Sequence, residues 1–165
     1  MPYHLRRMDK GINDQEKLKK VLKETRFVTL AMCNDNEPYL VSLSHSYDED
    51  ANCLYFHCAS EGKKLDFMKA NPHVWGQALI DHGYHEGQCS HLYISVMFKG
   101  FVEKVEDVGE KRRILRHMVI HHEKNPKPTL QSPTGLANDD ALRKTFVGRI
   151  IIEELTGKKS AEVDF

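Results

Sequence analysis

The sequence predicts an α+β domain, mainly β, in which antiparallel strands form a barrel with a few flanking helices. Three observations favour this fold class: segments of strand length recur along the chain, turn-forming residues separate several of them, and amphipathic helical segments interrupt their order. Neither an internal repeat nor a Gly/Ser-rich linker divides the 165 residues, so we expect a single domain over residues 1–165.

The first elements are expected to be a helix and a hairpin. Apolar residues recur at helical spacing after Asn13-Asp14, a pair that can cap a helix, so residues 14–25 predict an amphipathic helix. Residues 27–32 and 39–45 have the composition of strands and flank the turn-forming residues 34–38. This arrangement predicts a β-hairpin.

A third strand and a short helix are expected next. Residues 53–58 are apolar and aromatic and follow a turn at 48–52, so the first three strands predict an antiparallel meander. Residues 61–70 predict a helix with one apolar face. Asn71-Pro72 is expected to end this helix, because proline disfavours a helical conformation in the residue before it.

The second half of the chain adds strands and one longer helix. Residues 74–80 and 92–105 predict strands, and Gly100 marks a bend or bulge in the second of these. Residues 107–122 predict an amphipathic helix, and residues 146–155 predict the last strand, before a polar tail. A loop is expected between them, because it contains Pro126, Pro128 and Pro133.

Composition narrows the class of protein. The chain has 24 Lys and Arg residues and 24 Asp and Glu residues, so no overall charge attracts it to nucleic acid or to an anionic membrane. No apolar run approaches the roughly 20 residues of a membrane span, and the N-terminus does not resemble a signal peptide. The four cysteines form no CxxC pair and are expected to be reduced, buried thiols. We expect a cytoplasmic protein.

The segment from Tyr55 to Lys64 carries the clearest chemical signal. It leads from a strand through small polar residues to Lys63 and Lys64, which stand at the start of the expected helix. Free backbone N–H groups, the positive end of the helix dipole and two ammonium groups can together bind a phosphate. A solvated helix end remains the alternative interpretation of these two lysines.

Several segments match a known family in order and spacing. They include PYLVSLS at 38–44, LYFHCASEGKKLD at 54–66, YISV at 93–96 and RIIIEELTGK at 149–158. The pattern resembles the FMN-binding split barrels related to pyridoxamine 5′-phosphate oxidase, and most closely their 5-nitroimidazole-resistance branch. The resemblance covers nearly the whole chain and implies an antiparallel split β-barrel that binds FMN.

The resemblance also implies roles for individual residues. The second strand would lie along the isoalloxazine ring, the third strand beside the ring and its ribityl chain, and the lysine pair on the phosphate. Ser95 falls where a polar side chain touches the cofactor. The cofactor-binding residues implied in this way are Val41, Ser42, Leu43, Ser44, Phe56, His57, Lys63, Lys64 and Ser95.

The resemblance implies that His57 is a catalytic residue, because the nitroimidazole-resistance branch has a histidine at this place. A near-neutral pKa would let His57 donate a proton to a substrate as electrons leave the flavin. Taken alone, a strand histidine is more often a hydrogen-bonded core residue. The family pattern also implies a homodimer, in which the partner subunit completes each FMN site.

The expected function is therefore that of an FMN-dependent oxidoreductase acting on small molecules, with a nitro group as one candidate acceptor. A flavin carrier without turnover and an oxidase like pyridoxamine 5′-phosphate oxidase are the alternatives. The oxidase is disfavoured because Arg143, Lys144 and Arg149 form no matching second phosphate motif. No G-x-G-x-x-G motif identifies a nicotinamide donor.

Ten histidines raise the question of metal or haem binding. His117 and His121 share a helix face, but the chain has neither an HExxH motif nor paired CxxC motifs. We expect no metal site, and haem is an alternative ligand that histidines could hold. A second group, in one loop, combines a cysteine with three histidines, and we expect it to bind no metal either. It consists of His82, His85, Cys89 and His91.

Overall fold

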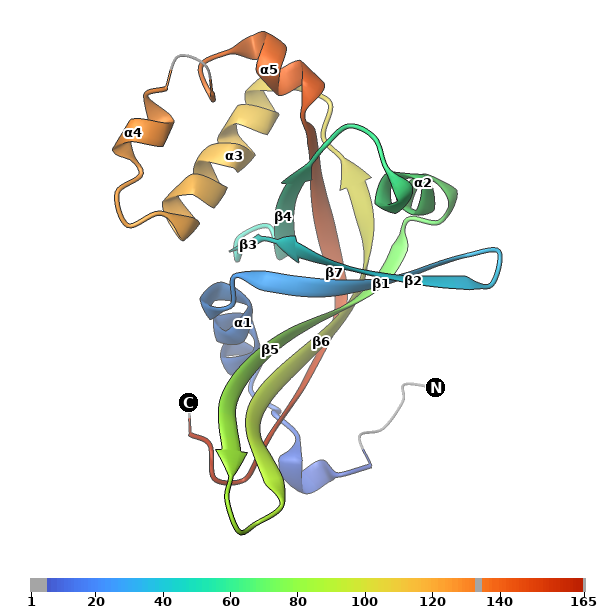
Figure 1. Ribbon diagram of the computed structural model, residues 1–165, viewed down its shortest axis with the longest axis vertical. Helices are drawn as coiled ribbons and strands as arrows, with labels where there is room; N and C mark the ends of the chain where they lie inside the picture. Colours follow the sequence, from blue (N-terminus) through green and yellow to red (C-terminus); the bar gives the residue numbers. More distant parts are fainter. Residues whose placement is uncertain (1–5, 133–134, 165) are drawn as a thin grey trace.

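The computed structural model describes residues 6–132 and 135–164, and it confirms the predicted antiparallel α+β architecture (Figure 1). The described strands are β1 (Phe27–Asn34), β2 (Glu37–Ser44), β3 (Ser46–Asp48), β4 (Cys53–Cys58), β5 (His73–His85), β6 (Ser90–Lys104) and β7 (Phe146–Lys159). They form one antiparallel sheet in the order β2-β1-β5-β6-β7-β4-β3. Strands β2 and β3 end this order without a ladder between them, so the barrel is split.

The predicted first hairpin is confirmed. Strand β1 pairs with β2 over its whole length, from Phe27 opposite Ser44 to Asn34 opposite Glu37. Asp35 and Asn36 form the turn, both with positive φ (48° and 63°). A two-residue turn of this kind matches the twist of the paired strands, and Asp and Asn tolerate it better than most residues.

Gly100 lies at a bulge, as predicted. The register of β6 against β7 shifts between Lys99 and Gly100. A Cβ atom at position 100 would lie 2.1 Å from the main-chain oxygen of Ile151. The strands can approach this closely only because residue 100 has no side chain.

The predicted meander of the first three strands is wrong. Strand β4 pairs with β7 on one side and with the short β3 on the other, rather than with β2. The residues from Cys53 to Phe56 are all buried, so both faces of β4 are covered. A strand that is apolar on both faces is more stable between two strands than at the edge of a sheet, and β7 and β3 together provide that position.

The predicted helices are confirmed, and two further short helices lie where a loop was expected. The described α-helices are α1 (Gln15–Glu24), α2 (Lys63–Ala70), α3 (Val108–His122), α4 (Lys127–Leu130) and α5 (Asp139–Lys144). The Asn138 side chain caps α5 by accepting hydrogen bonds from the N–H groups of Asp140 and Ala141. Pro133 lies outside the described residues. None of the described helices is long and apolar enough to cross a membrane.

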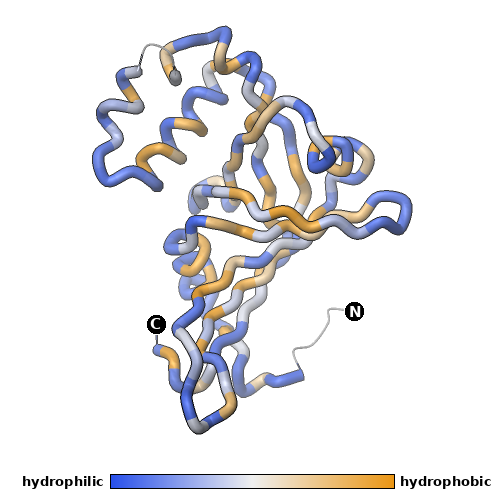
Figure 2. The backbone as a smooth tube through the Cα atoms, viewed as in Figure 1, coloured by the Kyte–Doolittle hydropathy of each residue, from blue (hydrophilic) through white to orange (hydrophobic). Residues whose placement is uncertain are grey.

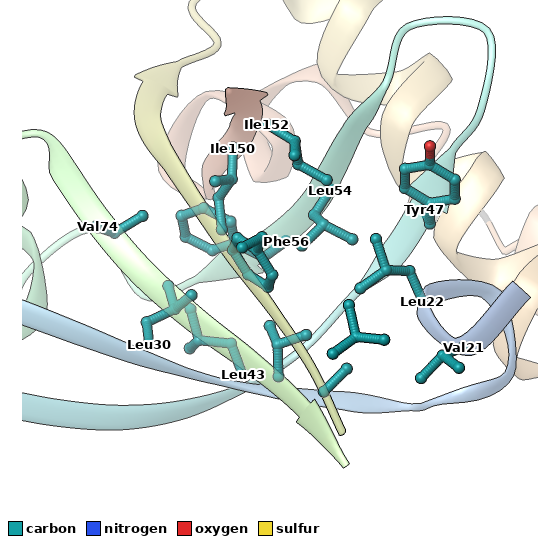
Figure 3. Packing of buried hydrophobic residues seen from close by; sticks show 14 of the residues in the cluster. Val21, Leu22, Leu30, Leu43, Tyr47, Leu54, Phe56, Val74, Ile150 and Ile152 are labelled. Carbon is teal, nitrogen blue, oxygen red and sulfur yellow. The ribbon is translucent and has the colours of Figure 1, made fainter. Parts of the chain in front are cut away.

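Two groups of buried side chains hold the structure together. One fills the barrel, where Leu22 of α1 and Leu43, Phe56 and Ile150 from three strands meet (Figure 3). The other lies between the sheet and the α3–α5 layer, and includes Ile114. Figure 2 shows apolar and polar positions alternating along the strands, as expected for a sheet with a buried and a more exposed face.

The cysteines form no disulfide among the described residues. Cys53 is buried and Cys58 is half-buried, as expected for small apolar side chains. Cys33 and Cys89 are exposed, so the prediction of burial is wrong for these two. Both lie near strand ends, at the first hairpin and at the β5–β6 turn, where side chains meet solvent.

Candidate functional site

A cavity of about 820 Å³ lies between the α3–α5 helices and the barrel. Ser44 of β2 and His57 of β4 line it from the barrel side, while Leu115, Met118 and Leu142 give the helical side an apolar surface. Figure 1 shows α3, α4 and α5 gathered on one side of the sheet, away from α1 and α2. Cavities of this size hold cofactors or small organic molecules.

Strand alternation explains why His57 faces this cavity. Along β4, Leu54 and Phe56 belong to the core inside the barrel, whereas Cys53 and Tyr55 pack in the cluster against α3. His57 is the next residue on the α3 side, because successive side chains of a strand point to opposite faces. Its side chain stays accessible and lines the cavity.

The surroundings of His57 make its imidazole neutral at neutral pH. Partial desolvation of the ring lowers the pKa of His57 below its ordinary value of 6.5. The charge that His122 can carry, in the same cavity, lowers this pKa further. A neutral imidazole can donate one hydrogen bond and accept another. His57 is therefore a hydrogen-bonding group at neutral pH, and it becomes an acid only in more acidic solution.

The other expected residues on β2 and β4 divide between two faces. Leu43 is 6% exposed and Phe56 is 1% exposed, and both point into the barrel (Figure 3). Val41 is half-buried and packs against the same core. Ser42 and Ser44 are exposed. Contacts from Leu43 and Phe56 to a ligand outside the barrel would therefore come from their main-chain atoms.

A row of polar side chains crosses the outer face of the sheet. The hydroxyl groups of Thr29 and Ser42 are hydrogen-bonded at 3.0 Å, and Gln77 Nε2 donates to Ser95 Oγ at 2.9 Å. Thr29 of β1 is opposite Gln77 of β5, so the two hydrogen-bonded pairs are neighbours on the sheet. Three strand-to-strand steps separate β2 from β6, so the row extends roughly 14 Å when it is followed across the curved sheet.

Ser95 does not line the cavity of His57. It lies in a second cavity of about 330 Å³, together with Gln77, Met97 and Lys158. The expected cofactor residues are therefore divided in this chain between the large cavity, the outer sheet face and the start of α2.

The start of α2 has the features of an anion site. Gly62 precedes it with φ of 131°, a conformation that side chains disfavour, and a Cβ atom there would meet no atom within 4 Å. No side chain caps this helix start. Lys63 Nζ donates a hydrogen bond to Glu37 Oε1 at 2.7 Å, which holds this lysine near the first residue of β2. Lys64 is half-buried. The open backbone and the two lysines fit a phosphate group.

Polar side chains of α3 hold the helical wall of the large cavity in place. Lys111 is only 3% exposed, and its ammonium group donates to the main-chain oxygens of Leu142 (3.1 Å) and Thr145 (2.7 Å). Arg112 Nε donates to the main-chain oxygen of Leu136 at 2.8 Å. These bonds fasten α5, and the segment before it, to α3.

His122, Glu123 and Thr129 also line the large cavity, and their place in the site could not be predicted. Their positions relative to β4 depend on how α3 and α4 pack on the sheet, and no sequence spacing reports that packing. Among the described residues, no three His, Cys, Asp or Glu side chains gather closely enough to hold a metal ion.

Solved structures of several bacterial proteins are similar to this chain. One is a protein of Bacteroides thetaiotaomicron assigned to 5-nitroimidazole antibiotic resistance, with 25% identity, a TM-score of 0.76, and coverage of 90% of this chain and 85% of that one. Another is an FAD-binding protein of Mesorhizobium loti, with 28% identity, a TM-score of 0.65, and coverage of 92% and 97%. The flavocytochrome Anf3 of Azotobacter vinelandii shares the fold, with a TM-score of 0.82 at 18% identity, over 99% of this chain and 76% of that one.

No curated protein matches the chain. The family model described as pyridoxamine 5′-phosphate oxidase matches residues 14–159, which span every strand of the barrel and both sides of the large cavity. The resemblance seen in the sequence motifs is thus confirmed over most of the chain, and the chain belongs to the pyridoxamine 5′-phosphate oxidase family.

Proposed function

We propose that this protein is an FMN-binding oxidoreductase for small molecules, of the 5-nitroimidazole-resistance type. The proposal depends mainly on one observation: a histidine that lines the large cavity and a site suited to an anion lie close together in the sequence. His57 lines the large cavity, and the uncapped start of α2 with Lys63 and Lys64 follows only a few residues later. The six-residue step from His57 to Lys63 limits the distance between their Cα atoms to about 20 Å, which one elongated ligand with a phosphate at one end can span.

The residues present fit the shape and charge of FMN. Lys63, Lys64 and the open backbone at Gly62 would hold the phosphate. The short side chains of Ser42 and Ser44 leave space beside β2 for a flat ring. The named similarity to an FAD-binding protein and to a nitroimidazole-resistance protein agrees with a flavin as the cofactor.

When bound, FMN supplies electron transfer, and the protein supplies position and protons. His57 would hold an acceptor molecule by a hydrogen bond from its neutral ring, and would deliver a proton in the fraction of molecules in which it is protonated. The apolar side chains of the helical wall would keep water away from the reacting groups.

The proposal includes a homodimer with FMN at the subunit interface. Large apolar side chains are exposed on the outer face of the sheet, which suits contact with a second subunit. They are Phe27, Leu40, Trp75, Leu79 and Met97. Ser95 lines a different cavity from Ser44 and His57 of the same subunit, so the cofactor would take its contact with Ser95 from the second subunit.

The absorption spectrum of the purified protein, alone and after addition of FMN and dialysis, tests the proposal. We expect a flavin spectrum, and we expect Lys63→Ala with Lys64→Ala to weaken FMN binding about tenfold or more. A protein that retains no FMN would contradict the proposal, and an intense Soret band would identify haem as the ligand instead. Anaerobic reoxidation of the reduced flavin by nitroaromatic and quinone acceptors then separates an enzyme from a flavin carrier.

A further inference from the structure

The helical wall of the large cavity carries polar groups to which the proposed flavin chemistry gives no role. His122 ends α3, Glu123 follows it directly, and Thr129 lies in α4. All three line the cavity. Thr129 Oγ1 lies 2.9 Å from each carboxylate oxygen of Glu123, so Glu123 is held in place at the cavity wall.

His122 has unused hydrogen-bonding capacity. Its Nε2 atom is buried without a hydrogen-bond partner in the part of the chain that the structure describes. A buried polar atom without a partner is costly, so a ligand or a water molecule that pairs with it is stabilised. His57 lies on the barrel side of the same cavity, and the two histidines are close enough for His122 to influence the protonation of His57.

The charges that line the cavity disfavour an anionic ligand. Glu123 contributes a carboxylate, and none of the described lining residues is a lysine or an arginine. Much of the remaining surface is apolar, from Leu115, Met118 and Leu136 among others. An anion that entered would lose its hydration and meet this like charge, while the buried ammonium group of Lys111, which does not line the cavity, already donates to the main-chain oxygens of Leu142 and Thr145.

We propose that this cavity selects a neutral, largely apolar small molecule with a hydrogen-bonding head group. His122 contacts the head group opposite His57 after a small rotation of its side chain, and Glu123 excludes anions such as carboxylates and phosphate esters. The inference rests on the proposed function in so far as this molecule is the reaction partner of the flavin. This preference for a neutral ligand would distinguish the protein from an oxidase that acts on a phosphorylated substrate.

Equilibrium dialysis with two nitroaromatic probes of the same size, 4-nitrobenzamide and 4-nitrobenzoate, tests the selection. We expect the full-length protein to bind the neutral amide about tenfold more tightly than the anion, both with and without added FMN. Equal affinities, or no binding of either probe, would overturn the inference. Because the measurement without FMN does not depend on the cofactor, failure to bind FMN would overturn only the proposed function.

Two variants assign the selection to individual residues. Glu123→Gln keeps an acceptor for Thr129 but removes the charge, so we expect the preference for the amide to fall to about threefold or less. His122→Phe is expected to weaken amide binding about fivefold. Glu86→Gln and His82→Phe, in the exposed β5–β6 hairpin, are the matched controls and should change neither value. An unchanged preference in Glu123→Gln would contradict the role of this carboxylate.

Discussion

His45 Nε2 donates a hydrogen bond to the main-chain oxygen of Leu22 at 2.9 Å, which links the segment after β2 to the last turn of α1. Since a carbonyl oxygen can only accept, this contact fixes the tautomer of the ring. The side chain is completely buried, and Nδ1 has no partner among the described residues. The ring is therefore held as a neutral imidazole.

Burial of His45 predicts that acid destabilises the protein. Desolvation lowers the pKa of His45 from 6.5 to about 4. Between these pH values the unfolded chain binds a proton that the folded protein does not, so the free energy of unfolding falls as the pH falls. We expect His45 alone to account for a loss of about 3 kcal/mol between pH 6.5 and pH 4, from the size of this shift.

Urea unfolding at pH 7.5 and pH 5 measures the part of this loss that falls above pH 5, which is about 2 kcal/mol for the same shift. His45→Gln keeps an N–H donor for Leu22 but does not titrate, so its stability should depend less on pH than that of the wild type. The same pH dependence in both proteins would show that other groups cause the acid sensitivity.

Lys111 is expected to be important for stability, although it is charged. Lys111→Met would keep most of the apolar contacts but leave the main-chain oxygens of Leu142 and Thr145 without this donor. We expect a loss of about 1–3 kcal/mol in the free energy of unfolding. Lys144→Met, at an exposed position of α5, serves as the control and should have little effect. Equal stabilities of the two variants would contradict this account.

Glu37 competes with the FMN phosphate for Lys63 if the proposed phosphate site is correct. Glu37→Gln removes the charge that holds Lys63 Nζ at 2.7 Å, so we expect FMN to bind about twofold to fivefold more tightly, as is typical for an exposed ion pair. Titration of flavin fluorescence with the protein measures the affinity. Unchanged or weaker binding would argue that Lys63 does not contact the phosphate.

The lowered pKa of His57 predicts how turnover depends on pH. The protonated ring is populated only below a pKa that is itself below 6.5, so kcat for a nitroaromatic acceptor should rise as the pH falls from 8 to 6. His57→Gln keeps a hydrogen-bond donor but cannot exchange a proton in this range. Its profile should lack the acidic rise, and a rise that persists would exclude His57 as the acid.

Trp75 tests the proposed dimer. Its side chain is 43% exposed on the outer sheet face, so Trp75→Glu places a charge where a second subunit would bury it. We expect the variant to be monomeric in sedimentation velocity and to bind FMN poorly. Ile120→Glu, at an exposed position of α3, is the matched control and should remain dimeric. A wild-type protein that sediments as a monomer would contradict the dimer itself.

The local elements could be predicted because their signals lie within short segments. Asp14, for example, caps α1 as expected, and its carboxylate accepts from the N–H groups of Glu16 and Lys17. Helix α5 has a comparable signal in Asn138, but it is short and follows a Pro-rich stretch, so a loop was expected. Strand β3 has only three residues, too few for a periodic pattern to emerge.

The longer-range features could not be predicted, because they depend on packing between distant segments. Strand β7 continues to Lys159, beyond its predicted end, since the polar residues there pair with β6; Lys158, for example, is opposite Ser95. Likewise, His122 follows two histidines that share a helix face, and only the packing of α3 on the barrel places it in a cavity with His57.

The α3–α5 wall is one uninterrupted stretch of chain between β6 and β7, whereas the proposed flavin contacts come from the barrel and α2. The two ends of this stretch are close together, because β6 and β7 are neighbours and Lys104 is opposite Gly148. Its replacement would therefore leave the strand order intact. If the proposed function is correct, exchange of this single segment would change the range of substrates, while the strands and α2 that would hold the flavin stay the same.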